Sequence, residues 1–403
     1  MLKAILVRIY PTSAQVLSLA KAFGTVRWLW NNSLAFNNQA YKDTGKGVSY
    51  YDLKKRIVEL KKEFPWLKET YSQVLQSTIL NLSRAFKNFF ERRAELPRFK
   101  SKRGKQSIQY PQHTKVEENK LYLPKIGWVK ANFHRQIIGE VKTITVSCNK
   151  SGHYYASILT DDGVELPANC GGGNVTAVDL GLIDFAVTSD GRKFSNPRHL
   201  KKHEKNLARK QKKLSKKQKG SNNRYKARRL VARVHEKIAN CRKDFLHKLS
   251  RLLVNESQVI AVENLNIKGM VRCSHLAKAI ADSSWGMFCN FLKYKCNWAG
   301  KVYLEVDRFF PSSKTCYVCL NVVDSLPLDV RAWQCNRCKT RHDRDTTAAI
   351  NIKNEAIRIL TTSGTGESHA WGDGVRPVGG RPTVFLASVD EPGSYDRIAC
   401  NQS

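Results

Sequence analysis

Hydrophobic and polar side chains alternate along residues 3–10, and this two-residue period predicts a β-strand. Pro11 ends the alternation, and Ser13 is a residue type that caps helices, so a helix is expected from Ala14. Through about residue 92 the apolar residues recur at helical spacing, which predicts helices that pack against one another. The clearest stripe consists of Leu75, Ile79, Leu82, Phe86 and Phe89.

The two-residue period returns between residue 97 and about residue 165, where turn residues separate several short alternating runs. These runs predict an antiparallel β-barrel or sheet. Because one strand precedes the helices, we predict that residues 1–11 and 96–168 form one β-barrel domain of the wedge type. The helical bundle of residues 12–95 would then be an insertion into this domain. Residues 166–174 are rich in glycine, and we place a domain boundary there.

The second half of the chain mixes strands and helices. Two short strands, a long basic helical hairpin at residues 197–252, a buried strand, a helix, another strand and a last helix are expected in this order. The predicted class is therefore α+β with several domains. We place an α/β core at residues 169–310, a cysteine-rich insertion at 311–342 and the last helix at 343–360. Residues 361–403 are rich in Gly, Ser and Pro and are predicted to be disordered.

The charge of the chain narrows the choice of partners. Lys and Arg number 69 against 34 Asp and Glu, which gives a formal net charge of +35. Nucleic acid is the polyanion that such a balance predicts. Residues 201–237 alone hold sixteen Lys or Arg and two Glu, and residues 98–107 form a second basic segment. No apolar run reaches the about 18 residues of a membrane span, and the start is unlike a secretory signal, so no membrane partner and a cytoplasmic protein are expected.

Four of the eleven cysteines are arranged as two Cys-x-x-Cys pairs separated by fifteen residues. Each pair can turn both thiolates toward one ion, and four thiolates at about 2.3 Å complete a closed tetrahedral zinc site. A redox Cys-x-x-Cys usually occurs singly and beside a βαβ unit. The pairs therefore predict one structural Zn²⁺ bound by Cys316, Cys319, Cys335 and Cys338.

Three acidic residues interrupt apolar segments. Asp179 and Glu263 each end an apolar β-run, and Asp345 opens the last helix. Buried carboxylates need a partner, and two Mg²⁺ or Mn²⁺ ions would supply it and support phosphodiester hydrolysis. Each acid taken alone could instead be an ion-paired carboxylate, and Asp345 could be a helix N-cap. Their order along strand, strand and helix is typical of an RNase H-like nuclease core.

The chain resembles the TnpB family of transposon-encoded RNA-guided nucleases, which are related to the type V CRISPR effectors. The segments that carry the resemblance span nearly the whole chain: KAILVRIYPTSAQ, LPRFKSK, LPKIGWVK, AVDLGLIDFAVTSDG, RKDFLHKLS, AVENLNIKGM, SSWGMF, FFPSSKTCYVC and WQCNRCKTRHDRDTTAAINI.

The resemblance implies that Asp179, Glu263 and Asp345 are the metal-binding triad of a RuvC-type site. It also places Arg344 near the scissile phosphate, and Asp343 is a nearby carboxylate of undefined role. The sequence departs from the family at two points. Thr347 replaces a common Asn, which could weaken helix positioning or activity, and Lys339 replaces the usual Gly of the second cysteine pair.

The function implied by the resemblance is RNA-guided cleavage of double-stranded DNA beside a short adjacent motif, with a guide RNA derived from the transposon end. Tyr51 and the cluster of Lys54, Lys55 and Arg56 are candidates for approaching that motif. The basic hairpin and residues 98–107 are candidates for backbone contact. A nuclease-inactive guided repressor and a transposase acting on the element ends stay open as alternatives, and both a monomer and a homodimer are compatible with the sequence.

Overall fold

The computed structural model describes residues 1–167, 173–327 and 329–363, and the chain divides into a first unit at Met1–Val164 and a second unit at Glu165–Ser403. The expected disordered tail lies outside the described residues except for 361–363, which are helical, so this part of the prediction is wrong. None of the helices in the described ranges is long and apolar enough to cross a membrane.

The elements of the first unit are β1 (Leu2–Tyr10), α1 (Ser13–Thr44), α2 (Tyr50–Glu63), the 3-10 helix η1 (Pro65–Glu69), α3 (Ser72–Phe90), β2 (Gln106–Tyr110), β3 (Lys115–Glu117), β4 (Lys120–Leu123), β5 (Gly127–Asn132), β6 (Glu140–Cys148) and β7 (Tyr154–Asp161).

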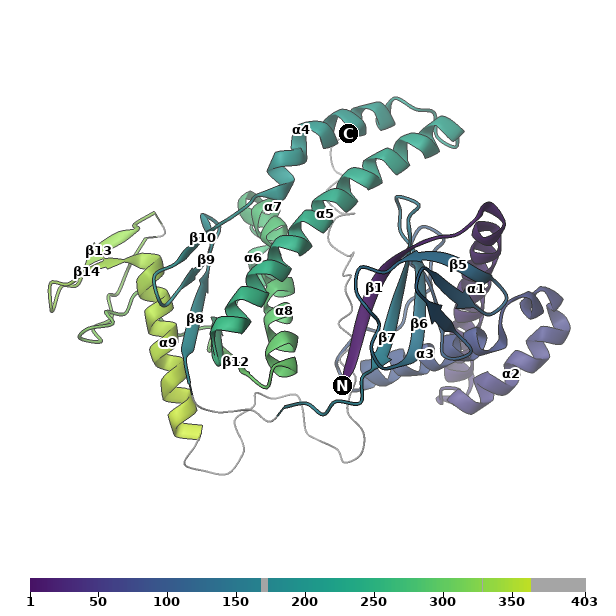
Figure 1. The fold of residues 1–403 in the computed structure, drawn as a ribbon, viewed down its shortest axis with the longest axis horizontal. Coiled ribbons are helices and arrows are strands. Elements are labelled where there is room, and N and C mark those ends of the chain that lie inside the picture. The colour runs from purple at the N-terminus through teal and green to yellow at the C-terminus, as the bar shows by residue number, and fades with distance from the viewer. Residues whose placement is uncertain (168–172, 328, 364–403) are drawn as a thin grey trace. The chain divides into compact units, whose positions relative to one another are not determined.

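A curled seven-stranded antiparallel sheet forms the first unit, with strand order β2-β6-β7-β1-β5-β4-β3 (Figure 1). The first strand pairs with both β5 and β7, so the helices between β1 and β2 interrupt the sequence of one sheet. Thr12, rather than Ser13, caps α1 and forms a capping box with Gln15, which corrects the expected cap by one residue.

The predicted helical stripe lies in the core of the bundle. Leu75, Ile79 and Leu82 are fully buried against residues of α1 and α2, and Phe86 packs at the edge of the same cluster. A separate core joins the start of α1 to the inner face of the sheet. The helices therefore stabilise each other and also cover the sheet from which they emerge.

The second unit is built on a five-stranded mixed sheet with order β10-β9-β8-β11-β12. Strand β11 is parallel to β8 and β12, while β9 is antiparallel to β8 and β10. The elements are β8 (Val175–Leu180), β9 (Asp184–Thr188), β10 (Lys193–Ser195), α4 (His199–Ser215), α5 (Asn222–Glu256), β11 (Val259–Glu263), α6 (Ile267–Met270), α7 (Ser274–Ser283), α8 (Trp285–Trp298), β12 (Val302–Val306), β13 (Ala332–Gln334), β14 (Arg341–Asp343) and α9 (Arg344–Ser363).

Helices cover both faces of this sheet. Val178, Ile260 and Val262 face the core formed with α5 and α8. Ala177 and Ala261, one position away in each strand, pack against α9. Side chains alternate between the two faces of a strand, so residues 179 and 263 also lie on the α9 face. This alternation decides where the functional side chains meet.

The basic segment forms the predicted hairpin from α4 and the first half of α5 (Figure 1). A short apolar strip that includes Leu207, Val234 and Ile238 joins its two helices. At its base, Asp282 of α7 accepts a hydrogen bond from the Leu200 backbone N–H and pairs with Arg242 at 2.6 Å. The hairpin is thus fixed to the second unit at one end.

Candidate active site

The three predicted acids lie on the α9 side of the sheet, near enough for Glu263 and Asp345 to act electrostatically on Asp179, but in the described residues their carboxylate oxygens do not all lie within 4.8 Å of one another. The parallel register aligns Val178 with Val262, so Asp179 and Glu263 follow at equivalent positions of neighbouring strands. Adjacent strands lie about 4.8 Å apart, so the two carboxylates start from neighbouring backbone positions. Asp345 lies in the first turn of α9, the helix that packs on β8 and β11. Elements from three separate parts of the sequence therefore bring these acids to one edge.

The electrostatics of the cluster show that Glu263 and Asp345 act on Asp179. Burial, followed by the negative charges of Glu263 and Asp345, raises the pKa of Asp179 to about 7. Burial also raises the pKa of Glu263. Arg344 opposes the shift at Asp179 without cancelling it. Such a cluster favours a cation that can neutralise several carboxylates at once.

The raised pKa of Asp179 predicts that, without Mg²⁺, the free energy of unfolding depends on pH. The folded state holds this proton more tightly than the unfolded state, so stability falls as pH rises above about 4, and the full penalty is present above about 7. In Mg²⁺-free buffer at pH 8, Asp179→Asn is expected to raise the melting temperature by roughly 2–8 °C. The gain should shrink toward pH 5. Thermal melts across this pH range check the prediction, and a variant less stable than the parent at every pH contradicts it.

Asp343 has a structural role at the start of α9. Its Oδ1 accepts a hydrogen bond from the backbone N–H of Thr346 at 2.9 Å, which is the contact of a helix N-cap. Lys193 pairs with its other oxygen at 2.9 Å. Burial would raise the pKa of Asp343, but these two contacts outweigh burial and hold it below its ordinary value. The alternative in which Asp345 is the N-cap is therefore wrong, whereas the alternative in which it is ion-paired matches its contact with Arg331.

Two arginines flank the acidic cluster, and they have different partners. The Arg344 guanidinium is buried and donates to the carbonyl oxygens of Pro327 and Val330. The side chain of Arg331 is 49% exposed, and its Nη1 lies 3.2 Å from Oδ1 of Asp345. A backbone hydrogen bond of 2.8 Å from Arg344 N to Arg331 O joins the two residues. Arg331 is the accessible guanidinium at the cluster.

Arg331 is not among the site residues predicted from the sequence, because its place beside Asp345 depends on how strands β13 and β14 pair. Strands β13 and β14 lie on either side of the second cysteine pair and form an antiparallel ladder in which Ala332 pairs with Asp343. Because the two strands pair around Cys335 and Cys338, the residues that flank the ladder at its open end lie next to each other. Arg331 and Arg344 are those residues, and only the pairing register reveals their proximity.

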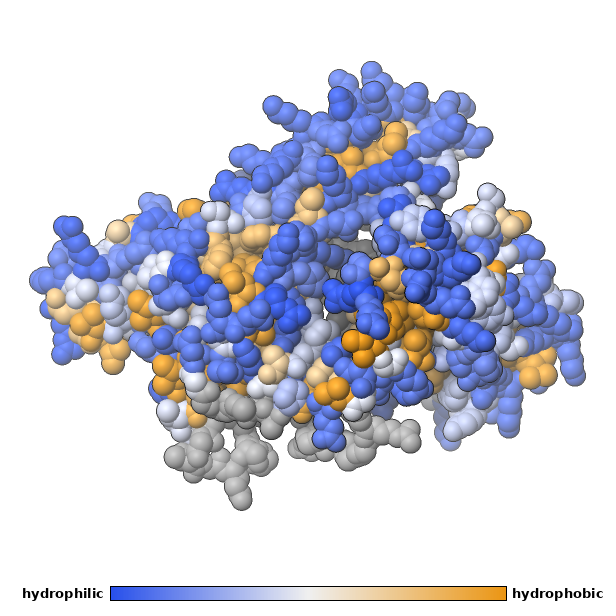
Figure 2. Space-filling model, viewed as in Figure 1, coloured by the Kyte–Doolittle hydropathy of each residue, from blue (hydrophilic) through white to orange (hydrophobic). Residues whose placement is uncertain are grey.

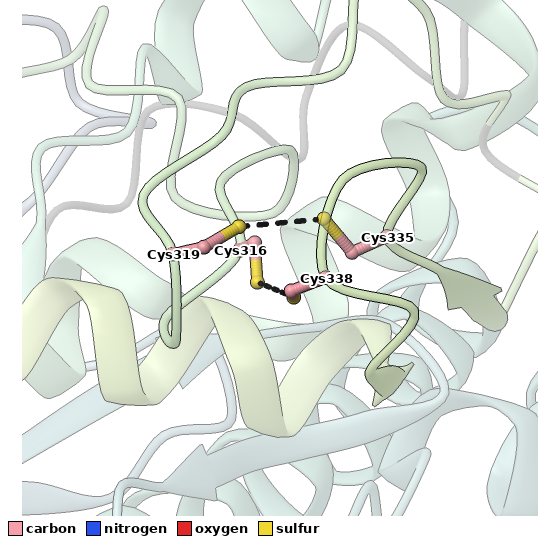
Figure 3. A group of neighbouring side chains, drawn as sticks. All are labelled: Cys316, Cys319, Cys335 and Cys338. Carbon is pink, nitrogen blue, oxygen red and sulfur yellow. Dashed lines mark hydrogen bonds between the residues drawn. The ribbon is translucent and has the colours of Figure 1, made fainter.

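The four predicted cysteines meet at one point, as Figure 3 shows. Their sulfur atoms all lie within 4.8 Å of one another, and the shortest separations are 3.5 Å for Cys316 to Cys338 and 3.6 Å for Cys319 to Cys335. Four soft ligands at such spacing fit one tetrahedral zinc ion. The Thr340 hydroxyl, followed by its backbone N–H, lowers the pKa of Cys338 to about 6, which favours the thiolate that binds zinc.

Both knuckles share one backbone conformation. Leu320 and Lys339 each follow the second cysteine of a pair, each has φ of 60°, and each N–H bonds to the carbonyl of the first cysteine. Glycine adopts this left-handed conformation without strain, which explains the glycine usual at position 339 in the resembling family. His342 is buried, with Nε2 3.2 Å from the Cys316 sulfur.

The cysteine cluster is tied to α9 by a buried amide. Asn351 donates to the backbone carbonyls of Ser312 and Thr315, each at 2.7 Å. Thr347 lies one turn earlier on the helix and is 1% exposed. An amide that positions this helix is therefore present at residue 351. Whether Thr347 weakens activity stays a prediction.

The predicted nucleic-acid contacts lie on several surfaces. None of the sixteen cations at residues 201–237 is buried, and Figure 2 shows the hairpin as predominantly hydrophilic on the face in view. In the first unit, Lys100 lies over the Trp30 ring at 3.6 Å, and Arg56 donates to Asn32. Tyr51, Lys54 and Lys55 are exposed on α2. Lys100 and Arg56 are thus engaged within the protein, whereas the other cations are accessible.

Comparison with known proteins places the chain in a family. Family models described as "Probable transposase", "Cas12f1-like, TNB domain" and "Helix-turn-helix domain" match residues 158–274, 285–352 and 1–46. A protein of Streptomyces pristinaespiralis named "Putative RNA-guided DNA endonuclease" is 38% identical over 378 residues, which cover 92% of this chain and 91% of that protein. This chain belongs to the TnpB family.

Other TnpB relatives extend the match. "Putative RNA-guided DNA endonuclease InsQ" of Escherichia coli K12 is 32% identical over 407 residues, which cover 96% of this chain and 99% of the relative. The fold resembles the protein in "Cryo-EM structure of the Cas12f1-sgRNA-target DNA complex", with a TM-score of 0.56, 14% identity and coverage of 88% of this chain and 99% of the other. In this TnpB protein, the helix-turn-helix match spans β1 and the single long helix α1.

Proposed function

We propose that this TnpB protein is an RNA-guided DNA endonuclease whose active site consists of Asp179, Glu263 and Asp345. The observation that carries the proposal is that the three acids lie on the α9 face, where burial, followed by the charges of Glu263 and Asp345, raises the pKa of Asp179. The names of its relatives support the same class of activity. The nuclease core would be RNase H-like, with the cysteine cluster as a zinc ribbon inserted before α9.

The donor set fits hard divalent cations. Asp179 and Glu263 present carboxylate oxygens from adjacent strands, and Asp345 adds another from the helix. Oxygen ligands of this kind favour Mg²⁺ or Mn²⁺ over zinc. When bound, such ions would activate water for attack on a phosphodiester and stabilise the departing 3′ oxygen. The four cysteines would hold a structural Zn²⁺, with no position left open for catalysis.

The surrounding residues divide the remaining work. Arg331 would bind a nonbridging oxygen of the scissile phosphate, because its guanidinium is exposed beside Asp345. Arg344 would position the acidic cluster, because it joins the loop that contains Pro327 and Arg331 to the start of α9. Asp343 would orient the first turn of that helix as its N-cap. The resemblance places Arg344 near the scissile phosphate, and we assign the phosphate contact to Arg331 instead.

Replacing Arg331 with alanine is expected to lower the single-turnover cleavage rate about 100-fold, because one preorganised charge at the phosphate is lost. Arg331→Lys should recover part of the rate, since the charge returns without the planar fork. Arg337→Ala, an exposed arginine of the same ribbon, is the control and should keep the parental rate. Zinc content is measured in all variants. Full activity of Arg331→Ala would assign the phosphate contact elsewhere.

The basic surfaces would hold the guide RNA and the guide–target heteroduplex. A heteroduplex is recognised through its backbone and shape, and exposed cations of the α4–α5 hairpin suit that task. Tyr51, Lys54 and Lys55 remain candidates for reading the motif beside the target. In this scheme base pairing supplies most of the sequence specificity.

The test is plasmid cleavage by the protein co-expressed with RNA from the 3′ end of its own element. Mg²⁺-dependent double-strand breaks at a target matching the guide are expected. Guided binding without cleavage would indicate a repressor, and joining of element ends without a guide would indicate a transposase. Either outcome would overturn the endonuclease assignment.

A further inference from the structure

The first unit contains an open cavity of about 130 Å³ that the proposed nuclease mechanism does not use. It lies between the start of α1, the segment that follows η1 and the turn that joins β4 to β5. A cavity of about 150 Å³ can hold one benzene ring, so this one has room for a single six-membered ring. The polar residues that line it include Lys21, Glu69, Thr70, Tyr71, Tyr110 and Lys125.

Two hydroxyl groups in the lining lack protein partners. Tyr110 is 2% exposed and Thr70 is 6% exposed. Among the residues that the structure describes, neither side-chain hydroxyl has a hydrogen-bond partner. Both oxygens stay open to the cavity, so water can bind them, and a ligand with both donors and acceptors could take the place of that water. The cavity therefore favours a polar ring over an apolar one.

The wall and the rim add aromatic and charged groups. The hydroxyl of Tyr71 lies 2.5 Å from Nδ1 of His113, so this ring is held in place as a wall of the cavity. At the rim, Lys21 pairs with Glu69 at 2.9 Å, and Lys125 has φ of 69° in the β4–β5 turn. An aromatic wall with cations at the opening suits a nucleotide.

We propose that this cavity binds one unpaired pyrimidine base, extruded from the bound nucleic acid. The base would meet the Tyr110 and Thr70 hydroxyls, the ring of Tyr71 would flank it, and its phosphate would lie near Lys21 or Lys125. Single-stranded and looped RNA is commonly recognised through bases that leave the stack in this way. The inference rests on nucleic acid being the partner of the proposed function, but not on cleavage.

The first test measures binding of mononucleotides to the full chain by saturation-transfer NMR. UMP and CMP are expected to bind at least about five times more tightly than AMP, GMP or ribose 5-phosphate, since purines exceed the cavity and the sugar phosphate lacks the base. Tyr110→Phe should weaken UMP binding at least about threefold while the melting temperature is kept, because only the unpaired hydroxyl is removed. Tyr122→Phe, a phenol on β4 outside the cavity lining, is the matched control.

Equal affinities for all nucleotides, or a Tyr110→Phe variant that binds UMP as the parent does, would overturn the proposal and mean that the cavity holds only water.

A second test places 4-thiouridine in the RNA or 4-thiothymidine in the target DNA of the assembled complex. A crosslink to Tyr71 or Tyr110 from one of them identifies the source of the base. Absence of both crosslinks in a complex that cleaves also overturns the proposal. Asp179→Asn should abolish cleavage and keep UMP binding, so failure of the nuclease proposal is distinguishable.

Discussion

Asp179→Asn is expected to lower guided DNA cleavage by at least about a thousandfold, a loss of about 4 kcal/mol of transition-state stabilisation. Asparagine keeps the size of the side chain but removes a charge from the three carboxylates that we propose as ligands of divalent cations. Asp179 is the most strongly perturbed of the three, with its pKa raised to about 7. Single-turnover cleavage of a guided target at saturating Mg²⁺ measures the loss. Guided binding of the same target should change less than about threefold.

Asp343→Asn is the matched control for this experiment. Asp343 lies two residues from Asp345, yet its oxygen caps α9, and asparagine is nearly as good a cap as aspartate. The control should therefore keep cleavage within about tenfold of the parent. Equal losses for the two variants would mean that general disturbance at α9, rather than metal binding, limits cleavage. Undiminished cleavage by Asp179→Asn would remove this residue from the active site.

The face on which Asp179 and Glu263 lie could be predicted because strand periodicity determines it, whereas Asp345 lies on helix α9. Ala177 and Ala261 face α9, so residues two positions later face it as well. The four-cysteine cluster could be predicted for a similar reason, since two-residue gaps bring both sulfur atoms of each pair to one point. In both cases the information lies in local spacing along the chain.

The partners of the two arginines could not be predicted in this way. Arg344 stands next to Asp345 in the sequence, which makes it the obvious choice for the phosphate. Its guanidinium nevertheless turns to the carbonyls of the ribbon loop, and Arg331, fourteen positions earlier than Asp345, takes the place beside the carboxylate. The different partners of the two arginines depend on the register of the β13–β14 ladder and on the path of the loop that contains Pro327 and Val330. The cavity around Tyr110 escaped sequence analysis because its lining comes from four separate segments.

Cys335→Ser is expected to lower both stability and cleavage, although Cys335 belongs to the cysteine cluster and not to the acidic cluster. A structural zinc site contributes about 10–16 kcal/mol to the folding of isolated zinc fingers, so losing one of four ligands should loosen the ribbon. We expect zinc content to fall from about one equivalent toward zero and the melting temperature to fall by at least about 5 °C. Zinc assay and thermal melts measure both, with Cys273→Ser, an exposed thiol outside the cluster, as the control.

Cleavage should fall at least about 100-fold in Cys335→Ser, because the ribbon carries the contacts that order the active site. Arg331 reaches Asp345 from the ribbon, and the ribbon carbonyls hold Arg344 at the start of α9. Asn351 anchors the same helix to the segment that precedes Cys316. Guided DNA binding should be affected less than cleavage, since the exposed cations of the α4–α5 hairpin lie outside the ribbon. A zinc-free variant that cleaves at the parental rate would show that the acids on β8 and β11 and the α9 turn are ordered without the ribbon.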